Sequence, residues 1–374
     1  MAEQSKRIMR IPNHRQLIRA DLKGKKVLVR FDFNVPIEDG KVGDVKRIDA
    51  ALPTLRKILE KGAETISVIC HLGRPDGKEQ AEYSVAPIAK ILCEDLNVRF
   101  YSQPVVTGSK YASLNKYFEI GKHIRLYENL RFDKEEEENN PAFAKELATL
   151  GDVFIQDAFA NIHREHASMV GVERILPTYA GLLVEKEIIN LFRLLGSPKE
   201  PFVAIIGGAK VSDKLPIVEA LSKRTQAVIV GGKTANEWIL EHRPKTGNIY
   251  FPTDGISKLG SIVPINEQTL RAGIFDIGPQ TIMLYKSILA SAKTIFWNGN
   301  LGMTENKRFV HGTYEVARFI AKLQVEKVAS GGNTAEVIDQ LKLGGHFNFV
   351  STGGGATSDF IIGKKMEALE ILLK

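Results

Sequence analysis

The sequence predicts an α/β protein built from two doubly wound parallel-sheet domains, Rossmann-like in type, that are joined by a hinge helix. Two observations lead to this fold class. Short apolar strands alternate with amphipathic helices along the chain, which is typical of βαβ units and of a parallel sheet. The strands of the second half run directly into glycine, whereas those of the first half end in charged or amide side chains. The two halves therefore share a layout and differ in chemistry at their strand ends.

The elements of the first half follow from their apolar periodicity. Strands are expected at residues 27–30, 66–70, 124–127 and 153–155, and helices at residues 49–61, 85–96 and 141–150. In the first of these helices Leu52, Leu55 and Leu59 lie on one stripe, as an amphipathic helix requires. Pro141 stands at the start of the third helix, where a missing backbone N–H is tolerated.

The boundary between the halves follows from a predicted helix at residues 185–195 that ends at Gly196-Ser197-Pro198. Beyond this break, strands are expected at residues 203–206, 228–230, 295–297, 328–330 and 349–352. We therefore predict an N-terminal domain at residues 1–184, a hinge helix at 185–197 and a C-terminal domain at 198–362. A final amphipathic helix at residues 363–374 is expected to pack back on the N-terminal domain.

Composition and charge argue against several classes of protein. The formal charge of +7 and the pI near 9.1 would suit nucleic acid, but the basic residues are dispersed, so no nucleic-acid partner is expected. No apolar run reaches about 18 residues, so no membrane span is expected, and the polar N-terminus does not resemble a signal peptide. Cys70 and Cys93 give no disulfide framework and are expected to be plain buried residues. We expect a cytoplasmic monomer that binds small acidic substrates.

Two glycine-rich segments of the second half indicate a phosphate site. In residues 207–214 a glycine pair follows a strand and precedes Lys210 and Lys214, which stand one helical turn apart. Residues 351–356 contain three consecutive glycines after the last strand, and such a run indicates backbone that passes close to a ligand. The alternative interpretation is an ordinary strand-to-helix turn with lysines on the surface.

The strand ends of the first half indicate a site for a second, smaller anion. Arginine binds anions through a fork of donors, and four arginines stand close to predicted strand ends, together with a histidine, an aspartate and an asparagine: Arg47, Arg74, Arg131, Arg164, His71, Asp32 and Asn34. The alternative is that each arginine is a separate, solvated surface residue. A polyphosphate site in one half and an anion site in the other are the requirements of phosphoryl transfer.

Three further patterns receive no catalytic role. The Gly-Gly-Lys-Thr sequence at residues 231–234 is not a P-loop, because apolar strand residues stand where the motif requires its first glycine and linking loop. His163 and His166 lack the further Cys or His that a zinc site needs, so we expect them to contact an anion or lie at the surface. The acidic run at residues 135–138 is expected to be a solvated loop or helix start.

At these residues the sequence resembles the phosphoglycerate kinase family. Nine segments carry the resemblance, and they occur in the family's order: 30–36, 46–48, 71–77, 128–132, 151–172, 207–214, 276–279, 297–302 and 351–356. The resemblance implies a hinged, two-domain glycolytic kinase with Mg²⁺ and ATP or ADP as cofactors. It would transfer a phosphoryl group reversibly between 1,3-bisphosphoglycerate and ADP, giving 3-phosphoglycerate and ATP.

The resemblance also implies the site residues. The phosphoglycerate would be held by Asp32, Phe33, Asn34, Arg47, His71, Leu72, Gly73, Arg74, Arg131 and Arg164. The nucleotide would be held by Gly208, Ala209, Lys210, Lys214, Gly232, Asn298, Glu305, Gly331, Gly332, Asn333 and Thr334. Catalysis would rest on Arg47, Lys210 and the N–H groups of Gly353, Gly354 and Gly355. The acceptor carboxylate is already ionised at neutral pH, so in-line transfer after domain closure requires no general base.

The chain departs from the family's usual pattern mainly on the nucleotide side. Asn333 stands where an aspartate usually helps to hold Mg²⁺, so we expect the protein to bind the metal weakly and the nucleotide phosphates to hold most of it. Asn300 replaces a proline, Lys233 replaces a glycine, and Ala160 replaces another glycine. Residues 238–254 form a shorter stretch than usual, and the C-terminal tail lacks the family's Leu-Pro-Gly.

These departures leave two alternatives to an active phosphoglycerate kinase. The first is a binding or scaffolding protein of the same fold whose Mg-nucleotide binding is impaired. The second is a kinase for a different acyl or sugar acid on the same framework. Calorimetry with phosphoglycerate and MgADP would separate the first from an active enzyme, and a substrate panel would separate the second.

Overall fold

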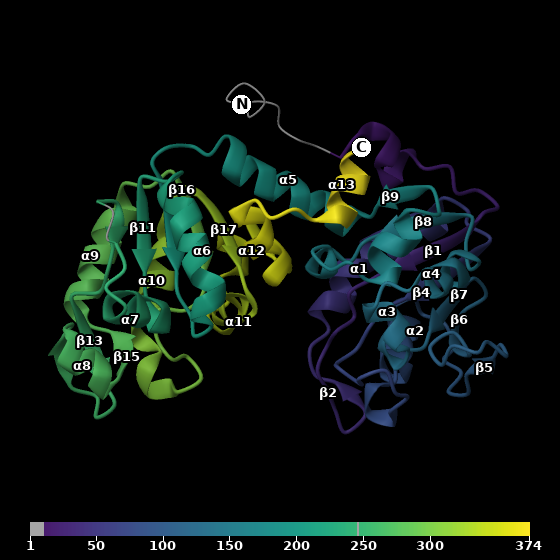
Figure 1. Ribbon diagram of the computed structural model, residues 1–374, viewed down its shortest axis with the longest axis horizontal. Coiled ribbons are helices and arrows are strands. Elements are labelled where there is room, and N and C mark those ends of the chain that lie inside the picture. Colours follow the sequence, from purple (N-terminus) through teal and green to yellow (C-terminus); the bar gives the residue numbers. More distant parts are fainter. Residues whose placement is uncertain (1–10, 245–246) are drawn as a thin grey trace. The chain divides into compact units, whose positions relative to one another are not determined.

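The computed structural model describes residues 11–244 and 247–374, which form two compact α/β units. The N-terminal unit contains residues 11–189 together with 365–374, and the C-terminal unit contains residues 190–364. Figure 1 shows a central sheet flanked by helices in each unit. Most strands of both central sheets are parallel, as the sequence predicts.

The N-terminal unit is built on a seven-stranded sheet of order β5-β6-β7-β4-β1-β8-β9, in which β6 is antiparallel to both of its neighbours. Its strands are β1 (Lys26–Arg30), β4 (Thr65–Ile69), β5 (Val105–Val106), β6 (Lys116–Ile120), β7 (Ile124–Tyr127), β8 (Val153–Gln156) and β9 (Thr178–Ala180). A separate hairpin joins β2 (Ile37–Glu38) to β3 (Lys41–Val42). The predicted strands are confirmed, whereas β5, β6 and β9, at or next to the two edges of the sheet, were not predicted.

Helices cover both faces of this sheet. They are α1 (Lys46–Glu60), α2 (Ala86–Asp95), α3 (Lys134–Glu137) and α4 (Pro141–Ala148), with 3₁₀ turns η2 (Asn13–Arg15), η3 (Leu17–Arg19), η4 (Ala81–Tyr83), η5 (Leu130–Phe132), η6 (Phe159–Asn161) and a π-helical turn η7 (Ala167–Gly171). Along β1, Val27 and Val29 pack with α1 and α2, whereas Leu28 packs with α4. This alternation of side chains is what a strand buried on both faces requires.

The C-terminal unit has a six-stranded parallel sheet of order β12-β11-β10-β16-β17-β18. Its strands are β10 (Phe202–Ile206), β11 (Ala227–Val230), β12 (Ile249–Tyr250), β16 (Thr294–Asn298), β17 (Glu326–Ser330) and β18 (Phe349–Ser351). A smaller antiparallel sheet, absent from the sequence prediction, contains β13 (Asp254–Ser257), β14 (Ile262–Pro264) and β15 (Ile274–Ile277). The five glycine-terminated strands that the sequence predicts are therefore confirmed.

The helices of this unit again divide between the two faces. They are α6 (Val211–Ser222), α7 (Gly232–Leu240), α8 (Glu267–Ala272), α9 (Pro279–Ala290), α10 (His311–Lys322), α11 (Gly332–Gln340) and α12 (Gly355–Ile362), with 3₁₀ turns η8 (Lys307–Phe309) and η9 (Gly344–His346). Val203 and Ile205 of β10 face α9, α10 and α11, while Ala204 and Ile206 face α6, α7 and α12. Because all strands of the main sheet are parallel, their carboxyl ends lie at one edge.

The C-terminal residues return to the N-terminal unit. The predicted helix at residues 363–374 is shorter in the structure, because Gly363 adopts a left-handed conformation that ends α12, and α13 begins only at Glu367 (Glu367–Leu373). In Figure 1 the yellow helix α13 lies beside β9, and it also contacts η7. Arg174 donates to Glu367 and so ties α13 to this unit.

The connecting helix α5 (Leu182–Gly196) begins on a buried carboxylate. Asp157, directly after β8, accepts hydrogen bonds from the N–H groups of Leu183 (3.0 Å) and Val184 (3.1 Å) in the first turn of α5. Burial raises the pKa of Asp157 to about 8, although the Thr54 hydroxyl and the two N–H groups oppose that shift. Asp157 stands at a strand end of the first half, as the predicted site residues do, but its side chain holds the start of a helix.

The raised pKa of Asp157 predicts a pH-dependent contribution to stability. A folded-state pKa above the unfolded value of 3.8 favours the protonated carboxyl in the folded chain. The contribution is therefore fully present below about pH 4 and is lost as the pH rises toward about 8. The free energy of unfolding of the wild type minus that of Asp157→Asn should fall across this window, by at most about 1.4 kcal/mol per pH unit. Urea unfolding at several pH values measures this difference, and a pH-independent difference would contradict the raised pKa.

Candidate active site

The first candidate site lies at the carboxyl edge of the N-terminal sheet. The loops after β1 and β4 are linked there by side chains, because Asn34 accepts a hydrogen bond from the N–H of Gly73 at 2.9 Å. Asp32 is buried, accepts from the N–H of Asn34 at 3.2 Å and pairs with the half-buried guanidinium of Arg47, which comes from the start of α1. These residues of the predicted substrate set therefore lie together.

Asn129 organises the neighbouring loops. Its side-chain oxygen accepts from the N–H groups of Leu72 and Arg131, both at 3.1 Å, and its amide nitrogen donates to the carbonyls of Leu72 (2.6 Å) and Tyr83 (3.1 Å). The guanidinium of Arg131 then donates to the carbonyl of Gly73 at 2.7 Å. A Cβ at Gly73 would meet the Tyr83 ring at 2.3 Å, so this glycine is required for packing rather than only for approach to a ligand. Leu72 is itself buried.

The arginines form one electrostatic cluster within this unit. Burial lowers the pKa of Arg131, and the carboxylate of Glu137, paired with it at 2.9 Å, opposes that shift. Burial also lowers the pKa of Arg164, which interacts electrostatically with Glu137, Arg74 and Asp32. Arg47 joins the cluster through Asp32. The structure thus brings the four predicted arginines to one edge, where they form a cationic surface suited to a small anion.

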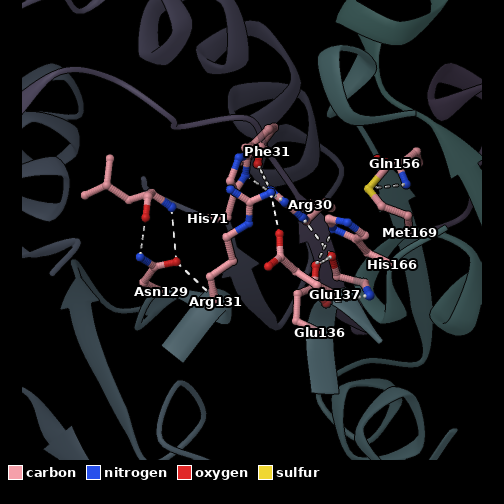
Figure 2. Close-up of polar contacts among 12 residues, drawn as sticks. Arg30, Phe31, His71, Asn129, Arg131, Glu136, Glu137, Gln156, His166 and Met169 are labelled. Atoms are coloured by element: carbon pink, nitrogen blue, oxygen red, sulfur yellow. Dashed lines mark hydrogen bonds and ion pairs between the residues drawn. The ribbon is translucent and has the colours of Figure 1, made fainter. Parts of the chain in front are cut away.

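A buried arginine that the sequence analysis did not select lies beneath this surface. Arg30, the last residue of β1, is 1% exposed. Figure 2 shows its contacts: it donates to Nδ1 of His71 at 3.0 Å and to the carbonyl of Phe31, and its Nε donates to the Ser168 hydroxyl at 3.0 Å. Because a guanidinium only donates, Nδ1 of His71 must accept, so the proton of the ring is on Nε2. Burial, together with the charge of Arg30, holds the pKa of His71 well below its usual value.

Glu136 provides the negative charge for this buried layer. Its carboxylate accepts from the Ser168 hydroxyl at 2.5 Å and from the Ser168 N–H at 2.9 Å, and it lies 3.7 Å from Nδ1 of His166. Burial would raise the pKa of Glu136, but the hydrogen bond from His166 and the charge of Arg30 lower it overall. The expectation that residues 135–138 are solvated is therefore wrong for Glu136, which is fully buried, because a π-helical turn supplies its partners.

The second candidate site lies at the carboxyl edge of the main C-terminal sheet. The loops there interlock through backbone hydrogen bonds: Gly207 N–H donates to the Asn298 carbonyl at 3.0 Å, and Gly208 N–H to the Asn300 carbonyl at 2.8 Å. Helices α6, α7, α11 and α12 all begin at this edge without a side-chain N-cap. Their free N–H groups and dipoles favour a bound anion.

The glycines of this edge fall into two classes. A Cβ at Gly207 would lie 2.2 Å from the Asn300 carbonyl, and one at Gly299 would lie 2.0 Å from the Gly207 carbonyl, so these glycines allow the loops to pack together. By contrast, a Cβ at Gly332 or Gly354 would meet no atom within 4 Å. Only the second class leaves backbone open to a ligand, and both of its members lie at starts of helices, α11 and α12.

The two predicted lysines differ in environment. Lys210 is exposed at the start of α6, next to Gly208 and Ala209. Lys214, one turn later, donates to the side-chain oxygen of Asn298. Burial, reinforced by the charge of Lys210, lowers the pKa of Lys214 to about 8. The charge of Asp213 opposes that shift, and a bound phosphate would add a further counter-charge to this pair of lysines.

Polar atoms at the ends of β16 and β17 are buried without partners. Within residues 11–244 and 247–374, the Asn298 amide nitrogen, the Asn300 side-chain oxygen and the Ser330 hydroxyl have no hydrogen-bond partner. Leaving such groups unpaired costs about 1–3 kcal/mol each, so their concentration at one edge indicates a site that a ligand completes. Ser330 was not among the predicted site residues. Its position between an apolar strand and a glycine pair could have indicated that it belongs to the site.

The remaining predicted nucleotide residues lie on the same loops. Asn333 donates from its amide nitrogen to Glu305 at 3.2 Å, which leaves its side-chain oxygen exposed. Thr334 is buried and accepts from the Gly299 N–H at 2.7 Å. Gly232 N–H donates to the Leu301 carbonyl at 3.0 Å, so this residue helps to join the loops. Gly331 has a φ of 96°, a left-handed region that favours glycine.

Lys233 and the histidines, which received no catalytic role from the sequence, receive none from the structure either. Lys233 of the Gly-Gly-Lys-Thr sequence pairs with Glu237 on the exposed face of α7 at 3.2 Å. In the described part of the chain, no group of three or more His, Cys, Asp or Glu side chains could hold a metal ion. Cys70 and Cys93 are buried and free, as expected.

We predict that His71 stays neutral, with its proton on Nε2, down to a pH well below the ordinary titration range of histidine. Nitrogen NMR of the ring across pH 5–8 measures both properties, and a titration of His71 near its unperturbed pKa of about 6.5 would contradict the prediction. Arg30→Met should remove the donor to Nδ1 and populate the other tautomer. Exposed Arg19 offers the matched control, because Arg19→Met should leave the His71 signals unchanged.

Comparisons with known proteins identify the family of the chain. The family model described as "Phosphoglycerate kinase" matches residues 17–269 and 239–364. The phosphoglycerate kinase of Clostridium tetani is 37% identical over 386 residues, covering 94% of this chain and 96% of that protein. The phosphoglycerate kinase of Leptospira biflexa is 38% identical over 384 residues, with coverage of 94% and 96%.

Solved structures of phosphoglycerate kinases also match this chain. The structure of phosphoglycerate kinase from Coxiella burnetii matches with a TM-score of 0.80 and 34% identity, covering 96% of this chain and 98% of that one. The structure of phosphoglycerate kinase from Pyrococcus horikoshii matches with a TM-score of 0.79 and 31% identity, with the same coverage.

Proposed function

The chain belongs to the phosphoglycerate kinase family and is a phosphotransferase, and from this premise we propose how its two edges divide the reaction. The arginine cluster of the N-terminal unit binds 3-phosphoglycerate or 1,3-bisphosphoglycerate. The glycine loops of the C-terminal unit bind ADP or ATP. The reaction transfers a phosphoryl group reversibly between the acyl phosphate and ADP. The binding or scaffolding alternative is not favoured, because relatives matching 94% of the chain are kinases by name.

The arginine cluster is the observation that supports this division most strongly. Arg47 pairs with Asp32 and Arg131 with Glu137. Arg74 and Arg164 have no ion pair among the described residues, so this edge of the sheet carries an excess of positive charge that an anion would balance. His71, held neutral with its proton on Nε2, adds a hydrogen-bond donor without adding charge. A 3-phosphoglycerate molecule carries a phosphate and a carboxylate, which suits several arginine forks at once.

No proton acceptor is required for the chemistry. The attacking carboxylate of 3-phosphoglycerate has an ordinary pKa near 4 and is ionised at neutral pH. Catalysis then depends on alignment and on neutralising charge on the transferred group. We assign this neutralisation to Lys210, Arg47 and the N–H groups of Gly353, Gly354 and Gly355. Because the two sites are on different units, the bound ligands must be brought together during turnover.

The residues present fit a magnesium-bound nucleotide. Asn333 commits its amide nitrogen to Glu305 and keeps its side-chain oxygen exposed, and a hard cation accepts such an oxygen ligand. When bound, Mg²⁺ neutralises charge on the nucleotide phosphates. An amide brings no negative charge, so in this proposal the phosphates hold most of the metal. Glu305 remains available for the ribose hydroxyls.

The proposal also covers the compartment and the oligomeric state of the enzyme. No helix in residues 11–244 and 247–374 is both long and apolar enough to cross a membrane. Free, buried Cys70 and Cys93 are compatible with a reducing, cytoplasmic compartment. We propose a cytoplasmic monomer that works on small molecules.

A coupled assay with 3-phosphoglycerate and MgATP tests the proposed function. Lys210→Ala should lower kcat about 10²- to 10³-fold, because it removes a cation that stabilises the transferred phosphoryl group. Lys223, exposed at the other end of the same helix α6, provides the matched control, and Lys223→Ala should keep wild-type turnover. Wild-type turnover no higher than that of Lys210→Ala would refute the assignment.

Asn333→Asp should make nucleotide binding more dependent on magnesium. The new carboxylate would add negative charge to the proposed nucleotide site, so repulsion from the ADP phosphates should weaken the binding of metal-free ADP severalfold. Attraction to the cation should strengthen the binding of MgADP severalfold. Calorimetry with and without Mg²⁺ measures both effects. Asn333→Ala removes the oxygen ligand, so it should weaken the binding of MgADP. Equal magnesium dependence in all three chains would exclude a metal-directed role for this position.

A further inference from the structure

A cavity of about 570 Å³ lies within the C-terminal unit, away from the glycine loops. Its lining includes the charged and polar residues Arg193, Lys199, Lys293, Glu326, Lys327 and Asn348. The cavity lies at the amino ends of β16, β17 and β18, whereas the glycine loops stand at the carboxyl ends. Since β16 is five residues long, about 15 Å of sheet separates this cavity from the nucleotide edge.

The walls of this cavity carry more positive than negative charge. Four cations, Arg193, Lys199, Lys293 and Lys327, stand against one carboxylate, Glu326. Arg193, Lys199 and Lys293 are exposed, and none has a side-chain hydrogen bond or ion pair within residues 11–244 and 247–374. They come from three separate segments: the last turn of α5, the loop before β10 and the turn before β16.

Lysines near the ends of helices often serve only to satisfy carbonyl groups. Lys327 has that role, because its buried ammonium donates to the carbonyls of Leu323 (2.6 Å) and Ala321 (3.4 Å) at the end of α10. The other three cations make no such contacts, so this explanation does not account for them. Like charges gathered without partners repel one another, and a bound anion removes that cost.

The remaining lining limits the kind of anion. Phe347 is buried against the core beside Trp297, with ring centroids 6.2 Å apart, so its face is not offered to a nucleobase. Asn348 uses its side-chain oxygen to accept from the N–H of Lys327 at 2.8 Å, which leaves its amide nitrogen as a donor. The volume falls within the range of about 300–1,000 Å³ that small ligands occupy.

From this geometry we propose that the cavity is a second anion-binding site, separate from the active site, that takes a small oligophosphate with no base. Lys199, Lys293 and Arg193 bind the phosphate groups by charge-assisted hydrogen bonds. The Asn348 amide adds a neutral donor. An anion with several charges is required, because a single charge would leave most of the cluster unneutralised.

A label placed in the cavity separates this site from the nucleotide edge. Gln324 is exposed in the lining, and both natural cysteines are buried, so Gln324→Cys can carry an environment-sensitive fluorophore. Titration of the labelled full chain with inorganic tripolyphosphate, without magnesium and at low salt, should give a saturable signal. Adding Lys199→Ala with Lys293→Ala should weaken the apparent affinity roughly tenfold or more, and added salt should weaken wild-type binding.

Two controls make the result decisive. Lys210→Ala in the labelled chain should leave the titration unchanged, because Lys210 lies at the other edge of the sheet. The exposed pair Lys223 and Lys258, changed together to alanine, should also leave it unchanged, which excludes an effect of net charge alone. A response that survives the Lys199 and Lys293 changes, or that disappears with Lys210→Ala, overturns the proposal. Kinase turnover of the Lys199 and Lys293 variant should match wild type, so the two proposals fail independently.

Discussion

The burial of the Arg30 guanidinium is the interaction on which the N-terminal site depends. Removing a charged group from water is costly unless its donor nitrogens find acceptors and a counter-charge is near. Arg30 meets this requirement with three acceptors and with Glu136 behind Ser168. The same bonds fix the loop after β1, the ring of His71 and the π-helical turn that holds Ser168. Deletion of one partner would leave the other charge buried and unpaired.

The C-terminal edge achieves the same rigidity with backbone rather than with charge. Gly207 and Gly299 pack so closely that any side chain would collide with a neighbouring carbonyl. The interlocked loops hold the uncapped starts of four helices in place. One unit therefore presents fixed cations and the other presents fixed N–H dipoles, which are two ways to prepare a site for phosphate before it arrives.

The sequence predicted the parallel strands of both halves and the helices of the first half well, because each repeats an apolar pattern over enough residues to be recognised. It missed strands of two or three residues, which are too short for a pattern: β2, β3, β5, β9, β12 and β14. It also missed the five-residue β6 and the small antiparallel sheet that contains β14. At the sites, sequence could select residues with recognisable motifs but could not tell a ligand contact from a support. Arg30 and Asp157 stand at strand ends like Asp32, and only the hydrogen-bond partners that the fold gives them show that they support other segments. Glu136 stands in a run of four acids that gives no sign of which one turns inward.

The return of α13 to the N-terminal unit has a consequence for biosynthesis. Ala368, Leu369 and Leu372 are buried in a unit whose other residues precede position 190. The whole C-terminal unit is therefore inserted into the chain of its neighbour. A nascent chain can complete the inserted unit while it is still being made, because those residues are contiguous. The unit that emerges first lacks its closing helix until residues 365–374 have been synthesised, and it must keep the apolar surface beneath that helix from misassociating in the interval.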